Sequence, residues 1–150
     1  MNSFMRCVSR TARCASLYRG EKLEKLGLNG CHHTYILAIC RTPGISQEQL
    51  SRTIYINKSN VTRQLTFLEQ NGFVTRTPDG EDRRIMRVYP TQKALDAYPV
   101  VLEVLEQWQD FVMEDFSPEE REELTRLMQR VNEKAAAYAE GRLAPKERRE

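Results

Sequence analysis

The segment Ile56–Phe73, which reads INKSNVTRQLTFLEQNGF, restricts the fold more than any other part of this sequence. Asn57 belongs to the residue types that cap helix N-termini, and Asn71-Gly72 is a typical helix end. Between these limits the apolar side chains recur at helical spacing, which predicts an amphipathic helix with one buried stripe. The stripe consists of Val61, Leu65 and Leu68.

The opposite face of this predicted helix is polar and basic. When the apolar stripe turns inward, hydrogen-bonding side chains face outward or lie at the flanks. They are Lys58, Ser59, Asn60, Thr62, Arg63 and Thr66. Groups of this length reach base edges and phosphates in a major groove, and the free N–H groups at a helix N-terminus suit a phosphate. Capping and ordinary solvation explain each group singly, so the interpretation depends on the neighbouring elements.

The residues before this segment predict two further helices joined by a tight turn. One extends from about Asn29 to Arg41 and is stopped by Thr42-Pro43-Gly44. The next begins at Ser46, which fits a capping box with Gln49 three residues later, and it ends near Tyr55.

After Gly72 the pattern changes from helical to extended. Phe73–Thr77 and Ile85–Tyr89 are rich in β-branched and aromatic residues, and Pro78-Asp79-Gly80 between them is a turn signal, so they predict a β-hairpin. Two helices joined by a turn, the second with a polar and basic start, followed directly by a hairpin, predict a winged helix-turn-helix. The fold is therefore expected to be mainly α with a small β-hairpin wing.

The predicted hairpin tip, PDGEDRRIMR, places Asp82 beside Arg83 and Arg84. A carboxylate in this position can hold one guanidinium extended while its neighbour reaches a phosphate or a narrow minor groove. The alternative is a solvated surface pair, which is common. We interpret the tip as a second DNA-contacting element because it follows the polar helix directly.

Helical patterns at both ends of the chain predict a dimer. We expect an Arg-rich helix over Ser3–Lys25, a long helix over Thr91–Phe116 that Pro99 should bend or split, and another helix from Ser117 onward. Their apolar faces exceed what a small lobe covers, so pairing with a second copy would bury them. The alternative is that these helices fold back on their own domain.

Length and composition fit one domain, because the chain has 150 residues and 40% hydrophobic content. Its apolar runs are short, so we expect no membrane span and a cytoplasmic protein. The net charge of +2 is uneven: residues 1–28 carry +4, residues 96–150 carry −6, and Gln49 to Leu68 holds three basic residues and no acid. Such a distribution favours contact between a polyanion and the first two thirds of the chain.

Several stretches resemble the MarR family (multiple antibiotic resistance regulators) of bacterial transcription factors. They are PGISQEQLS at 43–51, NKSNVTRQLTFLEQNGFVTR at 57–76, DRR at 82–84 and VYPT at 88–91. The resemblance implies an obligate homodimer, held by its first and last helices. Such a dimer binds a palindromic operator in double-stranded DNA with one recognition helix and one wing per half-site, most commonly as a repressor.

The resemblance also implies domain limits and contact residues. It gives a single domain over 1–150, with a winged-helix lobe at 28–92, dimerisation helices at 1–27 and 93–140, and a tail at 141–150 that we expect to be frayed. The recognition-helix matches are Lys58, Ser59, Asn60, Thr62 and Arg63, and the wing matches are Asp82 and Arg84, with Arg84 assigned to the minor groove. The predicted contact set also includes Ser46, Gln47, Thr66 and Arg83.

Two departures from the family pattern lie near the long helix. The family has Leu-Thr-x-x-Gly after the second wing strand, whereas this chain has Pro90-Thr91-Gln92-Lys93-Ala94. Pro99 also comes unusually early in the helix that follows. Both departures concern the strand-to-helix junction and the angle between the DNA-binding lobe and the dimerisation helices.

Members of the family respond to small aromatic compounds, oxidants or metals, and the resemblance does not choose among them. Cys7 and Cys14 lie seven residues apart on an Arg-rich helix, which suits a redox-active pair; the favoured alternative is that both pack as small apolar residues. A small aromatic ligand would enter a crevice lined by Tyr18, Tyr35 or Trp108, where core packing is again the alternative.

Cys31, His32 and His33 are adjacent, but neighbouring residues on a helix point in different directions and a zinc site needs further ligands. We therefore expect capping or interhelical hydrogen bonds from the two histidines, and neither a metal nor a cofactor.

Two classes of function compete. The leading hypothesis is a sequence-specific, DNA-binding transcriptional regulator, most simply a homodimeric repressor relieved by a small ligand or an oxidative signal. The alternative is a winged-helix protein-interaction or dimerisation module, which would not require an acid-free helix and wing arginines. An enzyme is disfavoured because the sequence has no phosphate loop, nucleophile elbow or zinc-peptidase signature.

Overall fold

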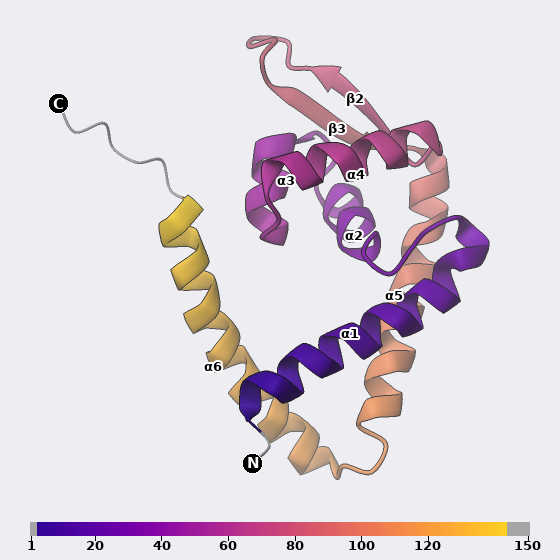
Figure 1. Cartoon of the computed structure of the whole chain (residues 1–150). Coiled ribbons are helices and arrows are strands. Elements are labelled where there is room, and N and C mark those ends of the chain that lie inside the picture. The colour runs from indigo at the N-terminus through magenta and orange to yellow at the C-terminus, as the bar shows by residue number, and fades with distance from the viewer. Residues whose placement is uncertain (1–2, 144–150) are drawn as a thin grey trace, which may run out of the picture. The chain divides into compact units, whose positions relative to one another are not determined.

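The computed structural model describes residues 3–143, and these form two compact units that divide between Gln109 and Asp110. The helices, drawn in Figure 1, are α1 (Phe4–Leu23), the short 3₁₀ helix η1 (Glu24–Leu26), α2 (His33–Arg41), α3 (Gln47–Ile54), α4 (Lys58–Gln70), α5 (Gln92–Val112) and α6 (Pro118–Leu143). The strands are β1 (Ile45–Ser46), β2 (Val74–Pro78) and β3 (Met86–Pro90). Within the described residues, no helix is sufficiently long and apolar to cross a bilayer.

Side-chain caps fix the starts of α3 and α4 as the sequence predicted, whereas α2 begins at His33, later than the predicted start near Asn29, and has no side-chain cap. Ser46 accepts a hydrogen bond from the Gln49 backbone N–H, and the Gln49 side chain accepts one from the Ser46 N–H, which completes the capping box of α3. Asn57 Oδ1 accepts from the Asn60 N–H (2.9 Å) and caps α4. Gly72, with a φ of 77°, takes the left-handed conformation just after α4 that glycine adopts most easily.

The sheet is antiparallel with strand order β1-β3-β2. β2 and β3 form the predicted hairpin, with Val74 opposite Pro90 and Pro78 opposite Met86, one residue later than the predicted strand limits. β1 pairs with β3 through Ile45 opposite Val88, and the sequence analysis missed this strand because two residues carry no periodic pattern.

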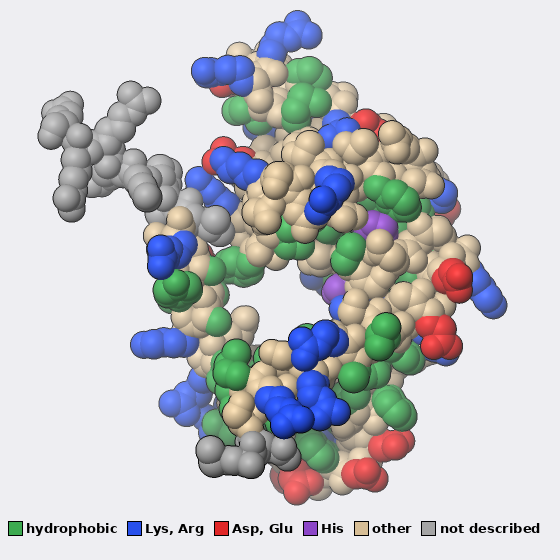
Figure 2. Space-filling view, viewed as in Figure 1, with side chains coloured by type: hydrophobic (Ala, Val, Ile, Leu, Met, Phe, Trp, Pro, Cys, Tyr) green, Lys and Arg blue, Asp and Glu red, His purple; other side chains and the backbone are tan. Residues whose placement is uncertain are grey.

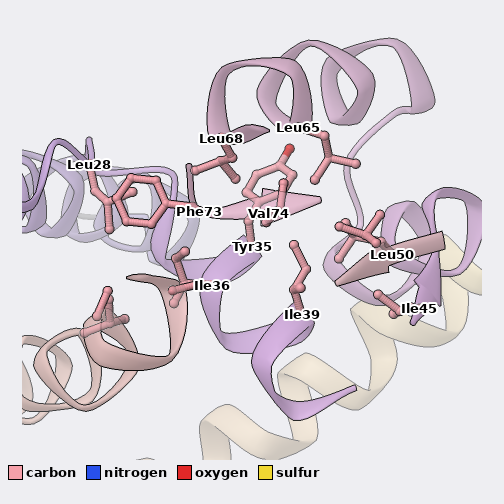
Figure 3. Packing of buried hydrophobic residues seen from close by; sticks show 14 of the residues in the cluster. Leu28, Tyr35, Ile36, Ile39, Ile45, Leu50, Leu65, Leu68, Phe73 and Val74 are labelled. Atoms are coloured by element: carbon pink, nitrogen blue, oxygen red, sulfur yellow. The ribbon is translucent and has the colours of Figure 1, made fainter. Parts of the chain in front are cut away.

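The core of the winged-helix lobe lies where α2, α3, α4 and the sheet meet, and Figure 3 shows its central side chains. The three stripe residues of α4 are each at most 1% exposed, which confirms the predicted inward face. They pack in one cluster with Tyr35, Ile36, Ile39, Leu50, Phe73 and Val88. Burial of this many large apolar side chains, each worth about 1.5–3 kcal/mol, orients α4 and turns its polar face outward.

α5 runs without interruption from Gln92 to Val112 and contains Pro99, so the predicted alternative of two separate helices is wrong. Pro99 is exposed and eight residues into the helix, where it removes one backbone donor without ending the helix. α5 also ends four residues before the predicted limit at Phe116.

α6 begins at Pro118, directly after the predicted cap Ser117, whose hydroxyl accepts from the Glu120 N–H (3.2 Å) while the Glu120 side chain accepts from the Ser117 N–H (2.9 Å). α6 continues to Leu143, beyond the predicted start of a tail at Gly141; residues 144–150 of that predicted tail lie outside the described part of the chain.

Candidate nucleic-acid interface

The outward face of α4 is available to a ligand. The apolar stripe is buried, and the polar side chains between its members reach the surface. Lys58, Ser59, Thr62 and Arg63 are exposed, whereas Asn60 and Thr66 are half-buried. In Figure 2 the surface over α4 is largely polar and uncharged, and Lys and Arg side chains gather at the tip of the hairpin above it.

Hydrogen bonds within α4 decide what this face offers. The Thr62 hydroxyl donates to the Lys58 carbonyl oxygen (3.0 Å), and the Thr66 hydroxyl donates to the Thr62 carbonyl oxygen (2.9 Å). Both hydroxyl oxygens therefore act toward a ligand as acceptors. Arg63 donates from Nη2 to Asn60 Oδ1 (2.9 Å), which leaves further guanidinium N–H groups for a base edge or a phosphate.

Lys58 forms an ion pair at the edge of this face. Its Nζ lies 3.2 Å from Glu48 Oε1, the same atom that pairs with Arg52 Nη2 at 3.2 Å. All three side chains are exposed, so these pairs are weak and exchange readily for a phosphate. Glu48 lies one residue before the acid-free segment that begins at Gln49 and was not predicted; α3 brings it to the start of α4.

Arg84 extends from the wing tip and is held by Asp82. Its Nε and Nη2 donate to the two carboxylate oxygens (3.0 and 2.9 Å), while the Arg84 side chain stays 91% exposed. The hydrogen bonds from Arg84 hold the pKa of Asp82 below its usual value, so the carboxylate remains charged at neutral pH. The predicted pairing of Asp82 with a wing arginine is confirmed. The neighbouring Arg83 is exposed and can extend toward a ligand.

A second carboxylate, Asp79, shapes the turn of the wing. Its Oδ2 accepts from the backbone N–H groups of Glu81 and Asp82 (both 3.1 Å), and its Oδ1 accepts from Arg87 Nε (2.9 Å). Arg87 also donates to the Gly44 carbonyl oxygen (3.2 Å), which ties the wing to the turn before β1. The sequence predicted Asp79 only as part of a turn and gave no signal for its pairing with Arg87.

The recognition surface and the wing line one common hollow of about 270 Å³. α3 contributes Gln47 and Glu48 to this hollow, α4 contributes Lys58 and Thr62, and the wing contributes Arg84. The fold thus brings predicted contact residues from three separate elements to a single surface.

Several known proteins are similar to this chain. The MarR family model matches residues 32–86, from the turn before α2 to the start of β3. The chain is 28% identical over 131 residues to the uncharacterized HTH-type transcriptional regulator YybA of Bacillus subtilis, which covers 87% of each chain. A crystal structure of MarR superposes with a TM-score of 0.84 at 29% identity, covering 91% of this chain and 93% of that one. These matches confirm the resemblance to the MarR family that the sequence shows.

A MarR-family regulator from Listeria monocytogenes, solved in complex with a 26mer DNA, shares the fold at 23% identity with a TM-score of 0.84, covering 99% of this chain and all of that one. The predicted winged helix-turn-helix fold is confirmed by these superpositions. The relatives compared here are transcriptional regulators, which agrees with the expectation of a DNA-binding regulator.

Ser46 has the capping role that the sequence predicted for it. It is only 7% exposed, and its hydroxyl accepts the capping hydrogen bond that starts α3. Ser46 also lines the common hollow, so its contact with DNA stays a prediction beside its capping role. Its neighbour Gln47 is half-buried and stays in the predicted contact set, because it lines the common hollow.

His32 and His33 make hydrogen bonds, as predicted. The Asn29 N–H donates to His32 Nδ1 (3.0 Å), and His32 Nε2 lies 3.0 Å from Gln64 Oε1 of α4, which places the ring proton on Nε2. The buried His32 ring stacks on Phe67 of α4 with ring centroids 4.8 Å apart. His32 therefore fixes the position of the recognition helix against the turn before α2.

The residues predicted to sense a signal fall into two groups. Cys7 and Cys14 are exposed on α1. Tyr35 is completely buried in the core, so the predicted crevice is wrong for this residue and core packing is confirmed. Tyr18 and Trp108 are half-buried and pack ring against ring, with centroids 5.1 Å apart.

Proposed function

We propose that this chain is a homodimeric transcriptional repressor that binds a palindromic operator. Each protomer inserts α4 into a major groove and places the wing over the adjacent backbone. The observation that carries this proposal is the common hollow, which joins the outward face of α4 to a wing arginine held extended by a carboxylate.

The chemistry of α4 fits base reading better than charge attraction alone. Arg63 offers guanidinium donors and the threonine hydroxyls offer acceptors, and base edges in a major groove present both kinds of partner. The first backbone N–H groups of α4 have no partner within the helix, and the Asn57 side chain accepts from one of them, that of Asn60. Phosphate contacts from Lys58 and Arg83 would fix the register of the helix on the duplex.

Arg84 is suited to the minor groove. It is almost fully exposed and its guanidinium is already oriented by Asp82, so less side-chain freedom is lost on binding. A narrow minor groove concentrates negative potential and attracts an inserted arginine.

The partner of the terminal helices is a second copy of the chain. α1 exposes Phe4, Met5 and Leu17, and α6, described by itself, exposes Leu127, Met128, Val131 and Tyr138. Apolar helix faces of this kind are covered in symmetric dimers, and a two-fold dimer matches a palindromic site.

The signal that releases the operator is a small aromatic ligand or an oxidant acting on Cys7 or Cys14. To separate the two, DNA affinity is measured before and after mild peroxide treatment. The measurement is made on the wild-type protein and on the Cys7→Ser, Cys14→Ser double variant.

The test selects duplexes from a random-sequence pool with the purified protein, then measures binding by fluorescence anisotropy across a salt series. We expect a palindromic consensus and a steep decrease in affinity with salt, because counterions are released from neutralised phosphates. Arg84→Ala should weaken operator binding by about 1–3 kcal/mol, whereas Arg126→Ala, an exposed arginine of α6 paired with Glu123, is the matched control and should change nothing. A protein that selects no sequence, or that binds without salt dependence, is instead a protein-interaction module.

A further inference from the structure

Arg76 of β2 lies at the centre of a hydrogen-bond network behind the recognition surface. Its side chain is only 16% exposed, unlike the wing arginines Arg83 and Arg84. Its guanidinium reaches groups on both α3 and α4, which are the two helices of the helix-turn-helix. Neither capping nor DNA contact explains a half-buried arginine at this position.

Glu69 of α4 neutralises this arginine. Arg76 Nη2 lies 3.1 Å from Glu69 Oε1, Nε lies 3.4 Å from Oε2, and the Arg76 backbone N–H donates to Oε2 (3.0 Å). These hydrogen bonds hold the pKa of Glu69 below its usual value, so the pair stays ionised at neutral pH. Because its charge is matched and its side chain is largely covered, Arg76 is poorly placed to neutralise a phosphate.

The remaining guanidinium donors orient two side chains of the recognition surface. Arg76 Nη1 donates to Gln47 Oε1 (3.4 Å), and Nη2 donates to the Thr66 hydroxyl oxygen (3.2 Å). Gln47 then donates from Nε2 to the Thr62 hydroxyl oxygen (3.4 Å). A guanidinium has donors and no acceptor, so it is compatible with only one orientation of the Gln47 amide. In that orientation the amide oxygen faces Arg76 and the amide nitrogen faces Thr62.

This fixed orientation determines what the surface offers to a base pair. Gln47 keeps one N–H donor that is not used by Thr62, and its oxygen is directed away toward Arg76. Thr66 donates to the Thr62 carbonyl oxygen and accepts from Arg76, so its direction is fixed as well. Without Arg76, the Gln47 amide is free to turn over and offer an acceptor in place of the donor.

We propose that Arg76 is a specificity-determining positioning residue, which sets the order of donors and acceptors along Gln47, Thr62 and Thr66 without touching DNA. This inference rests on the proposed operator binding. It predicts that Arg76 controls which base pairs are preferred opposite the start of α3 and the outward face of α4, and that it contributes little to the electrostatic part of the affinity.

The test uses full-length protein and the consensus duplex selected by the wild type, together with every single base-pair change in one half-site. Arg76→Lys keeps a charge for Glu69 but loses the planar fork that reaches Gln47 and Thr66 at once. We expect discrimination to fall roughly tenfold at one to three neighbouring base pairs, with the salt dependence of binding unchanged. The control Arg83→Gln, at the exposed wing tip, should instead reduce the slope of log affinity against log salt by about 0.9 per lost phosphate contact and leave the base preferences unchanged.

A second variant keeps the inference testable if Arg76→Lys folds poorly. Gln47→Met removes the oriented amide and leaves the Arg76–Glu69 pair in place, so it should relax preference at a subset of the same base pairs. In the double variant the two effects should not add, because both act through one amide.

Unchanged base preferences in Arg76→Lys, an equal loss of affinity for all sequences, or a reduced salt slope would each overturn the inference while leaving operator binding by the wild type established. If the wild type selects no duplex at all, the proposed function itself has failed.

Discussion

Replacing Tyr35 with Phe should stabilise the protein, although Tyr35 is a completely buried core residue. Figure 3 shows its ring rising from α2 with the hydroxyl directed toward α4, among Leu65, Leu68 and Val74. Within the described part of the chain, this buried hydroxyl has no hydrogen-bond partner. Burial raises the pKa of Tyr35 to about 12, with smaller contributions from neighbouring groups, so the hydroxyl is neutral throughout the working pH range.

The size of the effect follows from two opposing terms. A buried hydroxyl without a partner costs about 1–3 kcal/mol, because it gives up its hydrogen bonds to water on folding. Removing the oxygen loses a few dispersion contacts of about 0.1–0.2 kcal/mol each. The Tyr35→Phe variant should therefore gain roughly 0.5–2 kcal/mol in free energy of unfolding.

Urea unfolding followed by circular dichroism measures this gain. Wild type and variant are compared at one protein concentration, because dimerisation couples to stability. The midpoint should rise with an unchanged m value. Tyr98→Phe is the control: its hydroxyl accepts from Arg41 Nε (3.1 Å), so losing it should cost up to about 1 kcal/mol. Destabilisation of Tyr35→Phe by about 1 kcal/mol or more would mean that the hydroxyl has a partner in solution, and the reasoning would be refuted.

Three further predictions concern packing, pH and DNA. Gly30→Ala should destabilise the protein by about 1–3 kcal/mol in urea unfolding, since a Cβ there would overlap the Ser16 carbonyl oxygen, whereas Gly80→Ala, with open space around it, should not. Burial, followed by the charge of Arg19, lowers the pKa of His33 from 6.5 to about 4. The free energy of unfolding should therefore be constant above pH 6.5 and fall as the pH drops from 6.5 toward 4. A constant free energy of unfolding over that pH range would contradict this prediction. Arg63→Ala should lower the salt slope of operator binding by about 1.8 per dimer if each copy contacts one phosphate, and an unchanged slope with full affinity rules out that contact.

The sequence predicted the elements of the winged helix closely because their signals are local. Ser46 with Gln49 and Asn57 with Asn60 each complete a cap within three residues, and these two predicted helix starts hold in the structure. Helical spacing also predicted the buried stripe of α4. Signals of this kind depend only on backbone geometry, so the rest of the chain does not alter them.

Other features depended on contacts between residues far apart in the sequence. The two-residue strand β1 exists because β3 pairs with it, and Pro99 remains within α5 although a proline usually disfavours such a continuation. Ser46, predicted as a DNA contact, is largely covered but lines the common hollow. Tyr35, expected at a crevice, is enclosed by α4.

By itself, the sequence determined that this chain forms a winged helix-turn-helix with one polar and basic face, because capping, helical spacing and turn residues act over a few positions. Only the tertiary structure decided how that face is organised. It alone brings Arg76 against Gln47 and Thr66, Glu48 against Lys58, and Arg87 against Gly44. Those pairs join separate elements, and hydrogen bonds require distances of about 3 Å that no spacing in a sequence can specify.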